Sequence, residues 1–154
     1  MKIIINEDLI QTDVIASTQN EIFEQLAKPL YDLNLVNEGF LEGVRRREQN
    51  FPTGLPTEPF GVAIPHTDPE YVKQNAISVG VLRHPVTFTV MGTDDETTDV
   101  RVVFLLALNE SQKQLNILKS ITELIRDAKQ LEKLLSCDST EIYKILDSKL
   151  KGEI

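Results

Sequence analysis

The sequence predicts an α/β domain, in which helices cover both faces of a sheet of about four or five strands. Three observations support this fold class. Helical periodicity dominates the N-terminal third and the region after residue 109, while the part between them holds short apolar runs bounded by turn residues. The 154 residues also match the length of one domain with its own core. We therefore expect residues 1–154 to form a single domain.

The N-terminal region predicts a short strand followed by a helix. Ile3 to Ile5, alone or extended to Ile10, form an apolar run suited to a first strand or an extended arm. Thr18 is a candidate N-cap, and Glu21 three residues later completes a capping-box pattern. The apolar stripe of this helix comprises Ile22, Leu26, Leu30 and Leu33. Pro29 predicts a kink or break, because proline lacks the N–H group that a helix needs.

A second helix is predicted after Asn37, another candidate cap. Its apolar stripe comprises Phe40, Leu41 and Val44. The helix ends in Arg45-Arg46-Arg47-Glu48, where the positive charge of the chain is concentrated. Three prolines and a glycine between Asn50 and Pro59 then predict a loop.

The middle of the chain predicts the strands. Val62 to Pro65 form a short apolar run, which predicts a buried strand whose ladder ends at the proline. From Ala76 to Leu82, large apolar residues alternate with small or polar ones, which predicts a strand with one face more buried than the other. Val86 to Val90 show a similar alternation and predict a further strand. After a polar turn from Thr93 to Asp99, Val100 to Leu108 are almost continuously apolar. That run is typical of a central strand covered on both faces.

The C-terminal region predicts helices. One face of the first is lined by Leu115, Leu118, Thr122 and Ile125, and widened by Ile117, Ile121 and Leu124. A short second helix is indicated by Leu131, Leu134 and Leu135. Asp138 and Glu141 form a capping signature before the last helix, whose apolar positions are Ile142, Ile145, Leu146 and Leu150.

Charge and composition exclude several classes of function. Sixteen basic residues against 24 acidic ones give a net charge of −8, which disfavours nucleic acid as a partner because its phosphates would be repelled. The longest apolar run is far shorter than the ~20 residues of a membrane span. The apolar stretch at the N-terminus is too short for a signal peptide, and acidic residues follow it at once. The single cysteine fits a reducing compartment. We expect a cytoplasmic protein.

His66 is the leading candidate for chemistry. It follows the strand that ends at Pro65, where a rigid sheet meets a loop and a side chain is both held and accessible. Neutral imidazole is a nucleophile, and its ordinary pKa lies near neutral pH. The alternative is that His66 is a packed or solvated residue at a strand end.

Arg45, Arg46 and Arg47 have two interpretations. Cations are favourable at a helix C-terminus, so the three can be a solvated helix end. The functional interpretation is an anion site, because an arginine fork holds phosphate oxygens in a fixed geometry. Asn50, Thr53 and the backbone of Gly54 would add donors.

Other sites find little support in the sequence. His66, His84 and Asp68 can be drawn as metal ligands, but their spacing matches no standard site, and we expect no metal. Cys137 is expected to be a small packing residue. A glycine-rich nucleotide loop is absent, so we expect no cofactor.

Three motifs in order resemble one known family. Arg47-Glu48, Pro52-Thr53-Gly54-Leu55 and Gly61-Val62-Ala63-Ile64-Pro65-His66 resemble the enzyme IIA domain of the sugar phosphotransferase system, fructose/mannitol type. The segments Ala63-Ile64-Pro65-His66-Thr67-Asp68 and Pro85-Val86-Thr87-Phe88 are most similar to the galactitol branch. The resemblance covers nearly the whole chain and implies a mixed five-stranded sheet flanked by helices.

The resemblance also implies a function. The residue matching His66 would take a phosphoryl group on its tele nitrogen from the phosphocarrier protein HPr. It would then pass the group to a cysteine of the IIB component, which phosphorylates the sugar brought in by the membrane component IIC. Arg47 matches the arginine beside the active histidine. No nucleotide or magnesium is needed, because phosphohistidine already has a good leaving group.

Two positions depart from the family pattern. Family members usually have a small residue after the histidine. This chain has Thr67 there, which we expect to alter the entrance to the site. The His-Leu step that many members have after the buried strand is Gln114-Leu115 here. Gln114 can hydrogen-bond a phosphoryl oxygen but cannot become cationic.

Two further functions remain as alternatives. A IIA-like domain can act as a regulatory module, whose phosphorylation at His66 controls another protein. A metal-dependent hydrolase is the third hypothesis, and metal analysis of the purified protein would test it. The sequence does not identify the sugar, because the sugar binds the membrane component.

Overall fold

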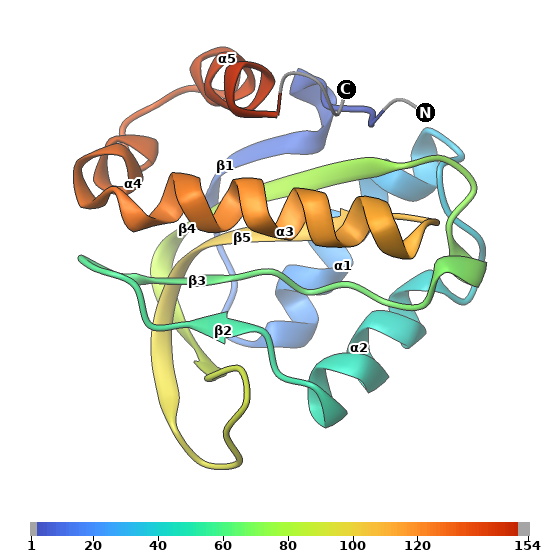
Figure 1. Ribbon diagram of the computed structural model, residues 1–154, viewed down its shortest axis with the longest axis horizontal. Helices are drawn as coiled ribbons and strands as arrows, with labels where there is room; N and C mark the ends of the chain where they lie inside the picture. Colours follow the sequence, from blue (N-terminus) through green and yellow to red (C-terminus); the bar gives the residue numbers. More distant parts are fainter. Residues whose placement is uncertain (1–2, 151–154) are drawn as a thin grey trace.

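One mixed sheet of five strands organises residues 3–150, in the order β1-β4-β5-β3-β2 (Figure 1). The computed structural model describes these residues, apart from the side chains of residues 111–114. The strands are β1 (Ile10–Val14), β2 (Gly54–Leu55), β3 (Gly61–Ala63), β4 (Ala76–Thr89) and β5 (Thr97–Ala107). β4 and β5 pair antiparallel, as do β2 and β3, whereas β1 lies parallel to β4 and β3 parallel to β5. The predicted α/β class and mixed sheet are confirmed.

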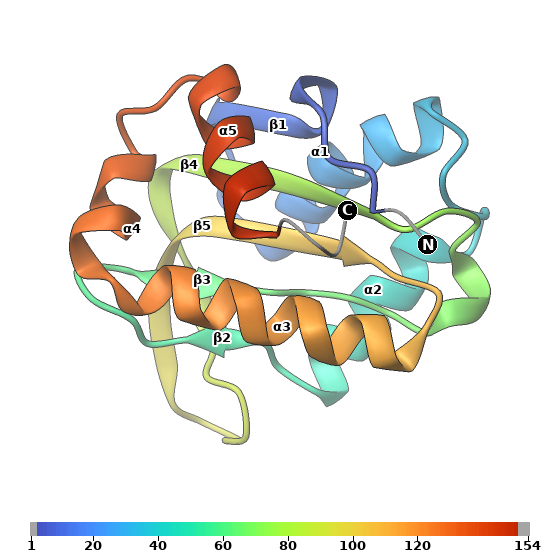
Figure 2. The ribbon, with the colours of Figure 1, turned by 45° about the horizontal axis from the view of Figure 1, so that its top comes forward.

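Helices cover both faces of this sheet, as predicted (Figure 2). On one face lie α1 (Gln19–Asp32) and α2 (Phe40–Asn50). On the other lie α3 (Ser111–Arg126), α4 (Ala128–Leu134) and α5 (Ser139–Lys149). Two short 3-10 helices, η1 (Glu7–Leu9) and η2 (Pro69–Tyr71), complete the described elements.

β5 is the centre of the fold, and its residues alternate between two hydrophobic cores. Val102, Phe104 and Leu106 pack toward α3, α4 and α5. Val103, Leu105 and Ala107 pack toward α1 and α2. Burying each large side chain contributes about 1.5–3 kcal/mol, so this strand fixes both layers to the sheet. The predicted coverage of the central strand on both faces is confirmed.

β4 differs from its prediction in two ways. The two expected strands are one, interrupted by a change of register between Val81 and Val86. The first half is buried on both faces rather than on one. The reason is the close approach of α1: the Ser78 hydroxyl donates to the carbonyl of Leu26 at 2.7 Å, and a Cβ at Gly80 would lie 2.8 Å from Leu26 Cδ2.

The N-terminal segment is also corrected. Ile4 makes a single bridge to Ala76, and the strand itself begins only at Ile10. The cap of α1 at Thr18 is confirmed, because its hydroxyl accepts from Glu21 N at 3.2 Å.

The predicted break at Pro29 is wrong, because α1 continues to Asp32. Proline leaves the carbonyl four residues earlier, that of Gln25, without its helical donor. The Gln11 side-chain amide donates to this carbonyl at 2.7 Å. A residue of β1 thus replaces the missing bond, and the helix runs on for most of a further turn.

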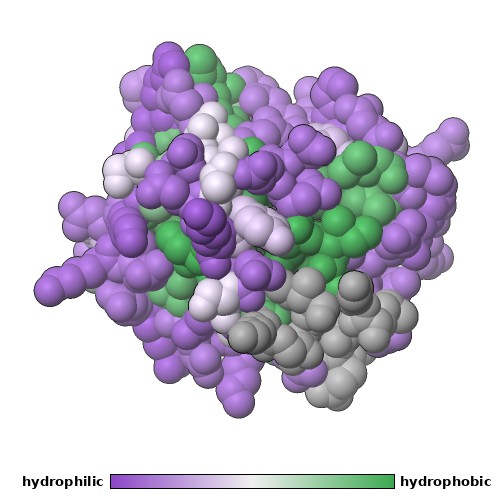
Figure 3. Space-filling view, turned by 90° about the horizontal axis from the view of Figure 1, so that it is seen from above, coloured by the Kyte–Doolittle hydropathy of each residue, from purple (hydrophilic) through white to green (hydrophobic). Residues whose placement is uncertain are grey.

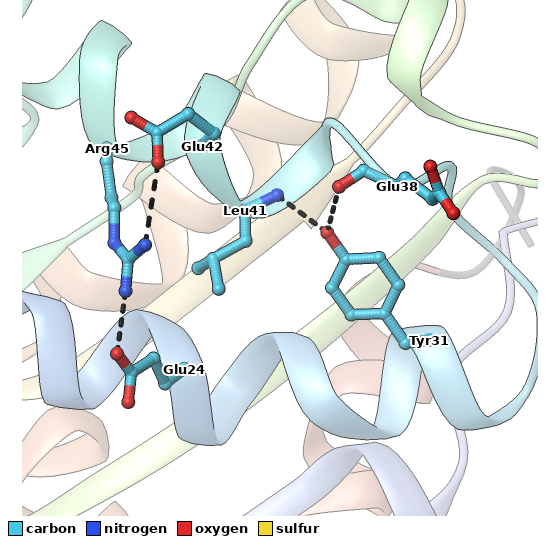
Figure 4. A network of polar contacts seen from close by, with 6 residues as sticks. All are labelled: Glu24, Tyr31, Glu38, Leu41, Glu42 and Arg45. Atoms are coloured by element: carbon cyan, nitrogen blue, oxygen red, sulfur yellow. Dashed lines mark hydrogen bonds and ion pairs between the residues drawn. The ribbon is translucent and has the colours of Figure 1, made fainter.

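Side-chain contacts fasten the first half of α2 to α1 (Figure 4). The Tyr31 hydroxyl accepts from Leu41 N at 2.9 Å and donates to the carbonyl of Glu38 at 3.0 Å. Arg45 lies between Glu24 of α1, at 2.7 Å, and Glu42 of its own helix, at 3.5 Å. α2 begins after Gly39, not after Asn37 as predicted.

The C-terminal helices follow their predictions with one exception. The buried residues of α3 are Ile117, Ile121, Leu124 and Ile125, but Leu115 is 63% exposed, so the apolar face is rotated from the expected one. The capping box of α5 is confirmed: Asp138 accepts from Glu141 N at 2.8 Å, and the Glu141 carboxylate accepts from Asp138 N at 3.1 Å.

The surface carries few large apolar side chains. The face with β1 and α5 is mainly hydrophilic, with separate hydrophobic patches between the polar side chains (Figure 3). Within residues 3–150, none of the helices combines the length and the apolar character that a membrane span requires.

Candidate active site

His66 lies where β3 leaves the sheet. Beyond β3 the pairing with β5 continues, because the carbonyl of Pro65 accepts from Leu106 N at 2.9 Å and His66 forms a bridge with Leu106. The ring is partly buried, and its Nδ1 lies 3.0 Å from the carbonyl oxygen of Ile64. A carbonyl oxygen only accepts hydrogen bonds, so Nδ1 carries the proton in this contact. The lone pair of the neutral ring is then on Nε2.

The surroundings of His66 favour this neutral form. Burial lowers the pKa of the imidazole below its ordinary value of 6.5, and the positive charge of Arg47 lowers it further. The Ile64 carbonyl and the Asp68 carboxylate act in the opposite direction. At neutral pH the ring is therefore uncharged, as a nucleophile must be.

Among the three arginines, Arg47 is the one whose charge acts on His66. Its guanidinium carbon lies 4.8 Å from the centroid of the Phe51 ring, and its Nη1 lies 3.5 Å from Asp68 Oδ1. Its Nε is buried and has no hydrogen-bond partner among the described residues. A cation held against an aromatic ring, with only a long contact to a carboxylate, retains donors for an anion.

The other two arginines make different contacts, because neighbouring residues on a helix point about 100° apart. Arg45 is engaged by glutamates of α1 and α2. Arg46 donates to the Tyr71 hydroxyl at 3.2 Å. Arg45 is therefore a half-buried, ion-paired residue, and the solvated-helix-end interpretation fits the exposed Arg46 best.

A small open pocket of about 100 Å³ lies beside Arg47. Its lining residues are Gly43, Arg46, Arg47, Asn50, Phe51, Thr67 and Asp68. Thr67 is buried, and its hydroxyl lies where a Cβ at position 43 would approach within 2.5 Å. It packs beneath α2 and also lines the pocket, and its effect on the entrance stays a prediction.

A buried carboxyl group, missed as a site residue in the sequence, lies behind Arg47. Glu48 is 5% exposed, and both of its oxygens accept hydrogen bonds from Thr53, at 2.8 Å from the backbone N–H and 2.7 Å from the hydroxyl. Burial raises the pKa of Glu48 to about 7, although the two Thr53 donors lower it. The candidate binding residue Thr53 thus has its hydroxyl engaged by Glu48.

The structure separates the remaining candidates. Gln114 belongs to the first turn of α3, but its side chain lies outside the described part of the molecule. His84 is exposed and lies seven residues along β4 from Ile77, the strand partner of Leu106, which places it about 20 Å from His66. Among the described side chains, no group of three His, Cys, Asp or Glu residues is arranged to hold a metal ion. Cys137 is buried in the core under α3, α4 and α5.

Comparison with known proteins identifies the family. Residues 3–149 match the model of the phosphoenolpyruvate-dependent sugar phosphotransferase system, EIIA 2. The chain belongs to this family. Members of the EIIA 2 family are components of a phosphotransferase, and the resemblance inferred from the motifs around Arg47 and His66 is confirmed.

Individual relatives agree with this assignment. The galactitol-specific EIIA component of Escherichia coli K12 is 24% identical over 135 residues, which cover 84% of this chain and 89% of the relative. The mannitol-specific enzyme IIA component of Staphylococcus aureus N315 is 27% identical over 146 residues, 94% of each chain. Among solved structures, enzyme IIAMtl of Escherichia coli, in complex with phosphorylated enzyme IIBMtl, has a TM-score of 0.80 at 19% identity, covering 95% of this chain and 99% of that one.

Proposed function

We propose that this EIIA component carries a phosphoryl group on Nε2 of His66. The observation that supports the proposal most directly is the contact between Nδ1 and the Ile64 carbonyl, which leaves Nε2 as the nucleophilic nitrogen of a neutral ring. This is the tele nitrogen that the family resemblance implies.

The transfer needs few groups from the protein. The Nε2 lone pair of His66 forms a bond to phosphorus while the bond from phosphorus to the donor breaks, and the electron pair leaves with the donor. Arg47 offsets the negative charge of the phosphoryl oxygens by charge-assisted hydrogen bonds. The proton stays on Nδ1, which donates it to the Ile64 carbonyl, so the ring keeps its orientation after it has accepted the phosphoryl group. Gln114 is a further candidate donor to these oxygens.

The donor and acceptor follow from the family. We propose phospho-HPr as the donor and a IIB component as the acceptor, with IIB coupled to a membrane component IIC. The relative of known structure was solved with a phosphorylated IIB protein, which supports this order. We further propose that the protein works in the cytoplasm and needs no cofactor. We also propose that residues 1–154 form one domain.

The sugar is proposed only as a class. Relatives specific for galactitol and for mannitol both match, at 24% and 27% identity. These are both sugar alcohols, and we propose a sugar alcohol such as galactitol as the substrate of the complete system.

Reconstitution tests this function. The protein is incubated with enzyme I, HPr and labelled phosphoenolpyruvate, and then with a IIB protein from the galactitol system. We expect acid-labile, base-stable label on His66 that passes to IIB. A protein that takes no label from phospho-HPr would contradict the proposal. Label on His66 that does not pass to any IIB protein would favour the regulatory module instead.

A further inference from the structure

A continuous series of hydrogen bonds joins the buried carboxyl group of Glu48 to the ring of His66. Thr53 donates to Glu48 through both its N–H and its hydroxyl. The carbonyl of Thr53 accepts from the N–H of Ile64 at 3.4 Å. The carbonyl of the same residue, Ile64, accepts from Nδ1 of His66 at 3.0 Å. Two residues therefore separate the carboxyl group from the imidazole.

Every member of this series behind the histidine is buried. Glu48 is 5% exposed, Thr53 2% and Ile64 3%. In such surroundings each hydrogen bond is stronger than in water. Because the bonds are connected through the backbone of Thr53 and Ile64, an acceptor at one end affects the position of the carbonyl at the other end.

Glu48 also adjoins the second member of the site. Arg47 precedes it in the last turn of α2, and the carbonyl of Arg47 accepts from Phe51 N at 2.6 Å. The bonds from Thr53 to Glu48 hold the segment over residues 49–52, where α2 ends, and this segment includes the Phe51 ring that contacts Arg47. One buried side chain is thus linked to the nucleophile through β3 and to the phosphoryl-binding cation through α2.

We propose that Glu48 is a positioning residue for phosphoryl transfer. Through Thr53 and Ile64 it fixes the orientation and the Nδ1–H tautomer of His66, and through the segment over residues 49–52 it fixes Arg47. The inference rests on the proposed function for its catalytic meaning, but its structural content is independent of that function. Glu48 touches neither the substrate nor the reacting nitrogen.

Two substitutions of Glu48 separate its acceptor role from its charge. In Glu48→Gln the amide oxygen can accept from Thr53 N–H, while the amide NH₂ donates to the Thr53 hydroxyl, which accepts as well as donates. In Glu48→Ala neither bond forms. Val44→Ala is the matched control, because Val44 is a fully buried residue of the same helix that takes no part in the series.

The tautomer of His66 is read from its ring ¹⁵N chemical shifts, with the exposed His84 as an internal reference. We expect a dominant Nδ1–H tautomer in the wild type, Glu48→Gln and Val44→Ala, and a mixture of tautomers in Glu48→Ala. Label transfer from phospho-HPr should fall about tenfold or more in Glu48→Ala, and stay within about threefold of the wild type in the other two variants.

Several outcomes would overturn the proposal. An unchanged tautomer and rate in folded Glu48→Ala would do so, and so would a Gln variant that behaves like the Ala variant. If Glu48→Ala does not fold, Thr53→Val removes only the hydroxyl bond and should shift the tautomer ratio in the same direction, and an unchanged ratio there would refute it. If the wild-type protein takes no label from phospho-HPr, the proposed function is wrong. The comparison of His66 tautomers between the variants then still tests the positioning role of Glu48.

Discussion

The two ends of the buried first half of β4, from Ala76 to Leu82, carry the same three residue types in different arrangements. At one end are His66, Arg47 and Asp68, and at the other His84, Arg83 and Asp13. Arg83 donates to both oxygens of Asp13, at 2.8 and 2.5 Å, whereas Arg47 makes one contact with Asp68, at 3.5 Å.

The difference between the two arginines shows which contacts distinguish a candidate site from an ordinary surface cluster. An arginine whose fork is filled by a carboxylate has few donors left for an anion, while one held by an aromatic ring keeps them. An exposed histidine such as His84 is free to rotate, whereas the ring of His66 is oriented by the Ile64 carbonyl. Residue type alone does not distinguish the two ends, but the contacts of each side chain do.

The largest expected effect separates the two histidines. His66→Ala should abolish phosphorylation by phospho-HPr, because it removes the only nucleophile that we propose. His84→Ala, the matched control, should accept label at the wild-type rate. The measurement is label incorporation from phosphoenolpyruvate through enzyme I and HPr. Label that persists in His66→Ala and disappears in His84→Ala would reverse the assignment of the two ends.

The next effect separates the two arginines. Arg47→Lys keeps the charge but loses the fork, and transfer should slow on the order of a hundredfold, for a loss of about 3 kcal/mol in the transition state. Arg83→Lys and Arg45→Lys should transfer at rates close to the wild type. Circular dichroism provides the folding control. Equal rates for Arg47→Lys and the wild type would remove Arg47 from the site.

The buried acid behind the His66 end should make stability depend on pH. Because the pKa of Glu48 is raised from 4.5 to about 7, the folded state binds more protons than the unfolded state between these values. The free energy of unfolding of the wild type should therefore fall, relative to Glu48→Gln, as pH rises from about 4.5 to about 7, by at most about 3 kcal/mol.

Urea unfolding at several pH values measures this difference. The lowered pKa of His66 has the opposite effect, since its contribution is lost as pH falls below 6.5, but it is present in both proteins and cancels. Parallel pH profiles for the wild type and Glu48→Gln would show that Glu48 is not buried in the protonated form.

The smallest expected effect lies at the register change of β4, beside Arg83. Arg83→Ala breaks an exposed ion pair with Asp13, and such pairs contribute little because water and salt screen them. We expect the melting temperature to change by less than about 3 °C, and phosphoryl transfer to be unaffected. A large loss of stability or of transfer would mean that the Asp13 end has a role that its geometry does not indicate.

Local patterns were sufficient for much of the fold. The caps at Thr18 and Asp138 and the apolar run of β5 depend on residues close in sequence, and each prediction was confirmed. Features that depend on distant residues were missed. The survival of α1 past Pro29 requires Gln11, and the burial of both faces of β4 requires the approach of Leu26.

The same distinction between local and distant residues applies to the site. The place of His66 at the exit of a strand followed from the apolar run and Pro65, and the choice of Arg47 followed from helical geometry together with the family resemblance. The burial of Glu48 was not predictable, because it depends on a loop with three prolines folding back to present both donors of Thr53. Glutamate at the end of a helix is ordinarily exposed, so the sequence gives no local signal for it.

The parallel pairing of β3 with β5 has a consequence for how the protein is made. Arg47 and His66 lie within one stretch of about 20 residues, whereas Ala63 pairs with Val103, 40 residues later. That contact closes a long loop, whereas β4 and β5 form a hairpin from adjacent segments and can pair first. During synthesis the residues of the site therefore leave the ribosome well before the strand that holds them, and we expect the nucleophile to acquire its orientation only once β5 has emerged.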